Sequence, residues 1–195
     1  MSEIQFYVVD TETNGLSLSF HEVYQISIIR CSDKMQFTRN IRVDRPENSS
    51  YDALKITGKT MNDLRSGVEK QELMREVEYF LSEDGAPSTH RCMIAHNAAF
   101  DRKFLCALWE KFNKKLPFDL YLDTIHMFKA YCKKQGIVKA KSNLTAACDL
   151  IGIRKMGSAH DAKIDTQHTF LLWQELAQTE DFLDHVKCLP HNLEL

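Results

Sequence analysis

Hydrophobic and polar positions in the first part of the chain follow the two-residue period of β-strands. Residues 4–10 form a nearly continuous apolar run that ends in Asp10, which is typical of a central strand buried on both faces. Residues 22–30 and 35–43 alternate instead, and this pattern predicts strands with one buried face. The three segments together predict an antiparallel meander.

Helical and strand patterns alternate along the rest of the chain. Residues 51–64 contain short turns of helix, and residues 135–141 form a basic loop. Short apolar segments predict two further strands at 92–95 and 118–122. Apolar residues at helical spacing predict helices over 68–83, 98–112, 124–134, 142–151 and 158–177. The element order, βββ-α-β-α-β-α-α-α, predicts an α/β domain with a mixed sheet flanked by helices.

Three predicted helices begin at residues that commonly cap helices. Asn97 and Ser142 stand where a side-chain oxygen can accept a hydrogen bond from a free backbone N–H. Ser158 and Asp161 have the spacing of a capping box at the start of the last long helix. We assign residues 1–178 to one domain and expect a short helical tail in the remaining residues 179–195.

Composition narrows the class of protein. The 195 residues suit one domain, and a net charge of −2 does not favour a protein that binds long duplex DNA by charge alone. No apolar run approaches the roughly 20 residues of a membrane span, and no basic segment precedes the first strand, so we expect neither a membrane protein nor a secretion signal. Six scattered cysteines are typical of thiols in a reducing compartment, which predicts a cytoplasmic protein.

Two acids close the first predicted strand. Alternation puts Asp10 and Glu12 on the same side of that strand, where their charges repel each other unless a cation lies between them. Hard divalent ions such as Mg²⁺ or Mn²⁺ prefer carboxylate oxygens. An isolated Asp-x-Glu triplet is usually surface decoration, but the buried strand before this one favours a site.

Further candidates lie in later helices. Asp101 and Asp165 belong to predicted helices, and Asp101 alone is explained as readily by the helix dipole. His160 stands at a helix start, where an isolated histidine more often caps or packs, although histidine is well suited to take a proton from water near neutral pH. Four carboxylates that converge would hold two metals about 4 Å apart and clamp a phosphodiester for in-line attack.

Three segments together resemble the motifs of a known family. They are Val9 to Leu16, Ala95 to Asp101 and His160 to Asp165, and they resemble the three motifs of the DnaQ-like exonucleases, the DEDDh branch of the DEDD superfamily. The resemblance implies a ribonuclease-H-like fold, two Mg²⁺ or Mn²⁺ ions, and removal of nucleoside monophosphates from the 3′ end of single-stranded nucleic acid.

The resemblance also implies roles for individual residues. Asp10 would contact both ions, Glu12 and Asp165 the ion that carries the attacking water, and Asp101 the other ion, with His160 as the base. The pocket for the terminal nucleotide would be lined by Thr13, Leu16, His96, Asn97 and Phe100. Asn14 departs from the small residues common at its position, which puts one substrate contact in doubt but not the chemistry.

Several alternatives remain open at this stage. DNA is the favoured substrate, and an exoribonuclease that acts on RNA is the alternative. An inactive binding module would be expected to lack at least one of the five central residues.

Gly58-Lys59-Thr60 resembles the end of a phosphate-binding P-loop but lacks the upstream glycine. His185, Cys188 and His191 have zinc-like spacing that Pro190 interrupts. Ten basic residues between Lys111 and Lys155 form either a solvated face or a phosphate-contacting rim. A polymerase partner or a homodimer partner cannot be recognised from the sequence.

Overall fold

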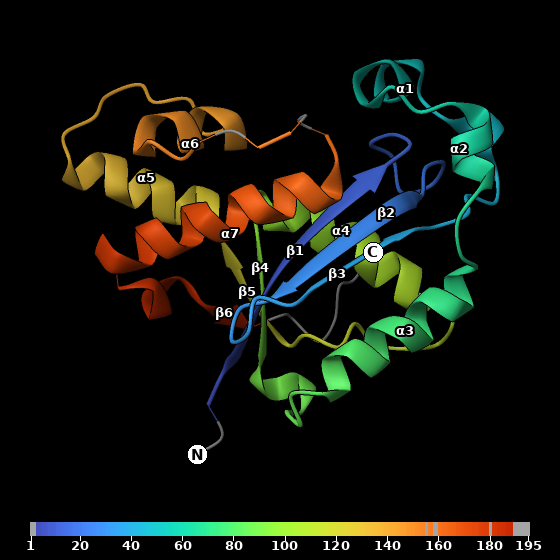
Figure 1. The fold of residues 1–195 in the computed structure, drawn as a ribbon, viewed down its shortest axis with the longest axis horizontal. Coiled ribbons are helices and arrows are strands. Elements are labelled where there is room, and N and C mark those ends of the chain that lie inside the picture. Colours follow the sequence, from blue (N-terminus) through green and yellow to red (C-terminus); the bar gives the residue numbers. More distant parts are fainter. Residues whose placement is uncertain (1–2, 155, 158–159, 180, 189–195) are drawn as a thin grey trace.

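A six-stranded mixed sheet forms the centre of the computed structural model, which describes residues 3–154, 156–157, 160–179 and 181–188. The strands are β1 (Gln5–Thr13), β2 (Val23–Arg30), β3 (Gln36–Asn40), β4 (Arg91–Ala95), β5 (Leu120–Asp123) and β6 (Lys187–Cys188). Their spatial order is β3-β2-β1-β4-β5-β6 (Figure 1). β1 pairs antiparallel with β2 and parallel with β4, β4 pairs parallel with β5, and β5 pairs antiparallel with β6. The predicted α/β class and mixed sheet are confirmed.

Helices cover both faces of this sheet (Figure 1). They are α1 (Tyr51–Thr57), α2 (Met61–Arg65), α3 (Lys70–Ser82), α4 (Ala98–Glu110), α5 (Thr124–Lys134), α6 (Leu144–Ile151) and α7 (Ala162–Thr179), with short 3₁₀ turns at Pro46–Asn48, Ser88–His90 and Phe182–His185. Tyr7 and Val9 of β1 share a buried cluster with α3 and α4, whereas Val8 shares one with α5, α6 and α7. β1 is therefore the central, doubly covered strand that its apolar run predicts.

The expectation that β2 is half buried is wrong. All eight of its residues are buried, because α7 lies across β1 and β2 on the face that the polar positions occupy. The polar side chains there find partners instead of solvent. Gln25 Oε1 accepts from Ala162 N–H at 2.8 Å, and Ser27 and Thr38 share a hydrogen bond of 2.9 Å. α7 is thereby held to β2 by a buried polar contact.

Two of the predicted helix caps need correction. Asn97 precedes α4, but its backbone is left-handed (φ 77°) and its side chain forms no capping hydrogen bond. The carboxylate of Asp123 accepts instead from Asn97 N–H and Ala98 N–H, at 3.1 and 3.0 Å. Ser142 is not the cap of α6, since Asn143 Oδ1 accepts from Ala146 N–H at 3.0 Å. In both cases a neighbouring side chain reaches the free backbone donors in place of the predicted one.

The start of α7 is only partly described. Ser158 lies outside the described residues, so the predicted capping box stays a prediction. α7 itself begins at Ala162, later than the predicted 158, and Asp161 Oδ1 accepts from Lys163 N–H at 2.9 Å. Asp161 therefore serves the free amides of the first turn of α7.

The helical tail predicted for residues 179–195 is wrong in its described part. After α7 ends at Thr179, a short 3₁₀ turn leads into β6, which pairs with β5. Phe182 packs against Phe6 and Trp173, with ring centroids 5.5 and 6.0 Å apart. These apolar contacts fix the segment to the sheet, where Lys187 and Cys188 complete its edge.

Other expectations concern cysteines, zinc and membranes. All six cysteines are free thiols. His185 and Cys188 lie in the 3₁₀ turn and β6, whereas His191 lies outside the described residues, so the zinc site stays a prediction. Within the described ranges, none of the helices combines the length and apolar character that a membrane span needs.

Candidate active site

The predicted site residues gather where β1, β4 and β5 end. Val8 is in register with Ile94, and Ala95 with Asp123, so the carboxyl ends of these parallel strands meet at one edge of the sheet. In open α/β sheets this edge is the usual place for a ligand site. Asp10 and Glu12 extend β1 beyond that register on the face covered by α7, and both are partly exposed. This edge of the sheet therefore carries two acidic side chains, those of Asp10 and Glu12.

Asp101 is held against the same strand from the other side. It is buried in the first turn of α4, and its Oδ1 accepts from Thr11 N–H at 2.9 Å and from Thr11 Oγ1 at 2.8 Å. Thr11 lies between Asp10 and Glu12 in β1. The interpretation of Asp101 as a simple helix-dipole residue does not account for this contact, because its carboxylate faces the strand and not solvent.

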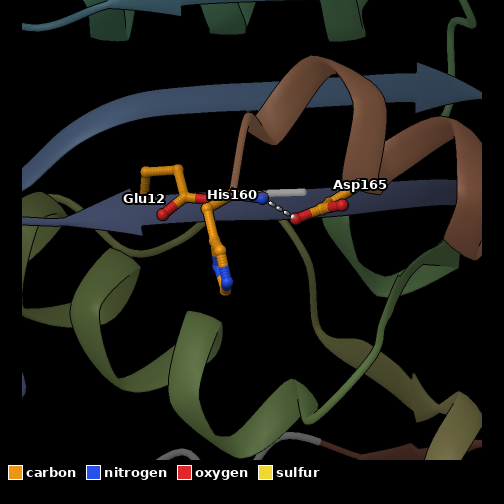
Figure 2. Close-up of side chains that lie close together, drawn as sticks. All are labelled: Glu12, His160 and Asp165. Carbon is orange, nitrogen blue, oxygen red and sulfur yellow. Dashed lines mark hydrogen bonds between the residues drawn. The ribbon is translucent and has the colours of Figure 1, made fainter. Parts of the chain in front are cut away.

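Glu12, His160 and Asp165 form the second half of the site. One ligand atom from each lies within 4.8 Å of the others. Figure 2 shows them converging from β1, from the turn before α7 and from its first turn. His160 is exposed and has a left-handed backbone (φ 65°). Its backbone N–H donates to Asp165 Oδ2 at 2.9 Å. A positive φ is uncommon outside glycine, so this turn is set by its contacts.

Burial raises the pKa values of all four carboxyl groups, and the other acids of the site raise those of Asp10 and Glu12 further. Burial and then the charges of Asp101, Glu12 and Asp165 raise the pKa of Asp10 well above its usual range. Burial, followed by Asp165 and Asp101, raises the pKa of Glu12 to about 7. Burial raises the pKa of Asp101 to about 7, against the hydrogen bonds from Thr11, and it also raises that of Asp165.

These shifts test whether the site fits metal ions. Carboxylates that are buried side by side disfavour one another's charge, and a divalent cation among them would remove that penalty. All the donors are oxygens except the imidazole of His160, and carboxylate oxygens suit Mg²⁺ or Mn²⁺ better than softer ions. The residues present therefore fit the predicted ions.

Two predicted substrate residues direct their polar atoms into the protein. Thr13 is buried, and its hydroxyl donates to the backbone oxygen of Gly15 at 2.7 Å. The ring of His96 hydrogen-bonds through Nδ1 to Thr124 Oγ1 at 2.9 Å and through Nε2 to the Ser142 oxygen at 2.8 Å. Both residues shape the surroundings of the site, and direct contact with a nucleotide stays a prediction for them.

The other three predicted substrate residues lie closer to solvent. Leu16 is 77% exposed in the turn after β1. Phe100 is partly buried in the first turn of α4, where its ring lies 5.0 Å from that of Phe104. Asn97 is exposed and carries the left-handed backbone described above. Leu16 and Phe100 thus offer apolar surface for a base, and that role also stays a prediction.

Several supporting residues were not predicted from the sequence. Thr11 anchors Asp101, Gln25 anchors α7, and Asp123 holds the N-terminus of α4. His168 lies one turn after Asp165, with its Nδ1 3.9 Å from Asp165 Oδ1, and its Nε2 accepts from Met156 N–H. Of these residues, only Asp123 could have been suspected from the sequence. It is an acid at the end of a strand, which is the same pattern that pointed to Asp10.

Asn14 resolves the one departure from the family pattern. It is fully buried, its Oδ1 accepts from Glu22 N–H at 2.6 Å, and its Nδ2 donates to Ser49 Oγ at 2.9 Å. The side chain therefore braces the turn after β1 against two neighbouring segments. A residue with this burial has no free polar atom left for a nucleotide.

Comparison with known proteins agrees with this geometry. The family model described as Exonuclease (RNase_T) matches residues 7–172. Ribonuclease T of Blochmanniella pennsylvanica is 30% identical, over 87% of this chain and 82% of that protein. The chain belongs to this exonuclease family. It is a DnaQ-like, DEDD-type 3′→5′ exonuclease, as the three motifs predict.

Solved structures of exonucleases share the fold. The nuclease domain of 3′hExo, a DEDDh family member bound to rAMP, has a TM-score of 0.70 at 15% identity, with 91% of this chain and 93% of that chain covered. Escherichia coli exonuclease I in complex with a dT13 oligonucleotide has a TM-score of 0.75 at 18% identity, with 91% and 41% covered. The predicted ribonuclease-H-like fold is thereby confirmed.

Proposed function

We propose that this exonuclease uses two divalent ions, Mg²⁺ or Mn²⁺, to hydrolyse the last phosphodiester bond at the 3′ end of single-stranded nucleic acid. The products are nucleoside 5′-monophosphates. One observation carries the proposal: Asp10, Glu12, Asp101 and Asp165 converge with His160 at the end of β1, where burial raises the pKa of each of the four carboxyl groups.

The four carboxylates are proposed to hold the ions. Asp10 would contact both ions, and the charges of Asp101, Glu12 and Asp165 all act on its carboxyl group. Glu12 and Asp165 would hold the ion nearer His160, and Asp101 the other. When bound, such ions lower the pKa of water and offset the charge that builds up on the phosphate.

His160 is proposed as the general base. A ring nitrogen takes the proton of the attacking water as the water oxygen bonds to phosphorus and the 3′-oxygen of the preceding nucleotide leaves. The imidazole reaches within 4.8 Å of the ligand atoms of Glu12 and Asp165. Leu16 and Phe100 would position the terminal base by stacking and apolar contact.

DNA is the first candidate substrate and RNA the second. RNA is kept as a candidate because one relative of this chain is a ribonuclease T. The choice rests on how the pocket treats one 2′-hydroxyl. The inactive binding module has no support, since all five central residues are present and the chain belongs to an exonuclease family. We also propose a cytoplasmic location, from the six free thiols.

The test uses purified protein with Mg²⁺ and three labelled substrates: single-stranded DNA, duplex DNA and RNA. We expect stepwise loss of mononucleotides from the 3′ end, fastest on unpaired strands, because a paired end must first be unstacked at a cost of a few kcal/mol. Asp10→Ala, with an unchanged circular dichroism spectrum, is the inactive control. Cleavage of covalently closed single-stranded circles, or full activity of Asp10→Ala, would contradict the proposal.

A further inference from the structure

The segment that carries α1 and α2 is tied to the end of β1. The backbone oxygen of Asn14 accepts from Ser50 N–H at 2.8 Å, and its side chain donates to Ser49. Leu54 of α1 packs against the buried cluster that contains Tyr24 of β2. In Figure 1, α1 accordingly lies beyond the arrowhead of β1. The segment therefore has a fixed place beside the proposed site.

This segment carries a lysine that lies against β2, the antiparallel neighbour of β1. Gly58 ends α1 in the left-handed conformation (φ 68°), which glycine adopts without strain. Lys59 follows, half-buried, with its Nζ 6.0 Å from the centroid of the Tyr24 ring. Tyr24 precedes Gln25, which is in register with Glu12 of β1. The ammonium of Lys59 thus lies over a side chain of the strand that pairs with β1 at Glu12.

The charge of Lys59 acts on one acid of the site, Glu12. It lowers the pKa of Glu12, against burial and the charges of Asp165 and Asp101, which raise it. It also lowers the pKa of Asp63, whose carboxylate is engaged in the capping box of α2. Within the described part of the chain, Lys59 forms no ion pair with a carboxylate. Its ammonium is therefore available to an anion that enters the site.

We propose that Lys59 Nζ binds a non-bridging phosphate oxygen of the substrate strand beside Glu12. This inference rests on the proposed function. A strand of phosphates that approaches a cluster of carboxylates is repelled, and a nearby cation reduces that repulsion. Lysine suits this role because its ammonium is a compact charge on a flexible stem, which follows a phosphate without demanding one geometry. Gly58-Lys59-Thr60 therefore does not form the end of a P-loop, because it follows a helix and a P-loop follows a strand. In this proposal the tripeptide contributes one lysine.

The experiment measures kcat and KM on a 3′-labelled dT oligonucleotide at fixed Mg²⁺ over a series of NaCl concentrations. For Lys59→Met we expect kcat/KM to fall roughly tenfold, mainly through KM, which is the lower end for a lost hydrogen bond to a charged group. The slope of log(kcat/KM) against log[NaCl] should become shallower by about 0.7, the value for one phosphate contact on a single strand. A purely structural role would leave that slope unchanged.

Two further variants sharpen the test. Lys59→Arg keeps the charge and should restore the wild-type slope. Lys55→Met removes an equally charged, exposed side chain one turn earlier in α1 and should leave both kcat/KM and the slope unchanged. Thermal melts of each variant establish that the fold is intact.

Three results would overturn the inference. They are a wild-type slope in Lys59→Met, a failure of Lys59→Arg to restore the slope, and an equal change in Lys55→Met. A wild-type protein that degrades no oligonucleotide would refute the proposed function instead, and the inference would fall with it. The two failures are therefore distinguishable.

Discussion

Glu12→Gln should make the metal-free protein more stable above neutral pH. Burial, followed by the charges of Asp165, Asp101 and Asp161, raises the pKa of Glu12 from its ordinary 4.5 to about 7. A carboxyl with a raised pKa binds its proton more tightly in the folded state than in the unfolded state. Its protonated form therefore favours folding, and that contribution is lost as the pH rises from about 4.5 to about 7. The amide of glutamine does not titrate and avoids this loss.

The size of the effect follows from the same values. One pH unit of separation between folded and unfolded pKa corresponds to about 1.4 kcal/mol. A rise from 4.5 to about 7 therefore costs the folded state roughly 3 kcal/mol at most by pH 8. For a domain of this length, that free energy corresponds to a change in melting temperature of roughly 6–12 °C. Relief of the neighbouring acids, above all Asp10, adds in the same direction.

The assay is a series of thermal melts in EDTA between pH 4.5 and pH 8. We expect the wild-type melting temperature to fall relative to that of Glu12→Gln across this range, so that the variant melts higher at pH 8. Glu72→Gln, on the exposed face of α3, controls for the loss of one charge. Parallel curves for wild type and Glu12→Gln would refute the reasoning, because they would show that the buried acids do not repel one another in the folded protein.

Two further predictions concern metal and base. Mg²⁺ or Mn²⁺ should raise the wild-type melting temperature by binding the folded state only, with about 2.7 kcal/mol gained at a free concentration one hundred times the dissociation constant; calorimetry that detects no divalent ion binding to the intact site would contradict the two-metal proposal. His160→Asn should lose roughly 10²–10⁴-fold in turnover, the usual contribution of a positioned base, with little change in melting temperature. A stable, fully active His160→Asn protein would show that another group takes the proton.

The sequence predicted elements whose physics is local. The apolar run before Asp10 and the helical spacing around Phe104 are set by which faces are buried, and both predictions agree with the structure. The acids of the site were found because they stand at the ends of such elements. Their positions relative to one another could not be predicted from any one segment. Asp101, for example, belongs to α4 and is held to β1 by a hydrogen bond from Thr11.

The failures at β2 and at Asn97 share one cause. β2 was predicted as half buried because its polar positions looked exposed. Its polar face is covered by α7, however, and Ala162 of α7, which bonds Gln25, lies 137 residues later in the chain. Asn97 was predicted to cap α4, yet Asp123 from another strand takes that role. A partner that is distant in sequence leaves no pattern at the position it serves.

The pairing of β6 with β5 covers the backbone of β5 at one side of the sheet. An unpaired edge strand exposes backbone N–H and C=O groups that can recruit the edge of another chain. Lys187 and Cys188 occupy that position on β5, opposite Tyr121 and Leu120. A chain ended at residue 178 would keep every proposed catalytic residue but uncover this edge. The outer strand β6 therefore shields the backbone of β5, although it contributes no group to the proposed chemistry.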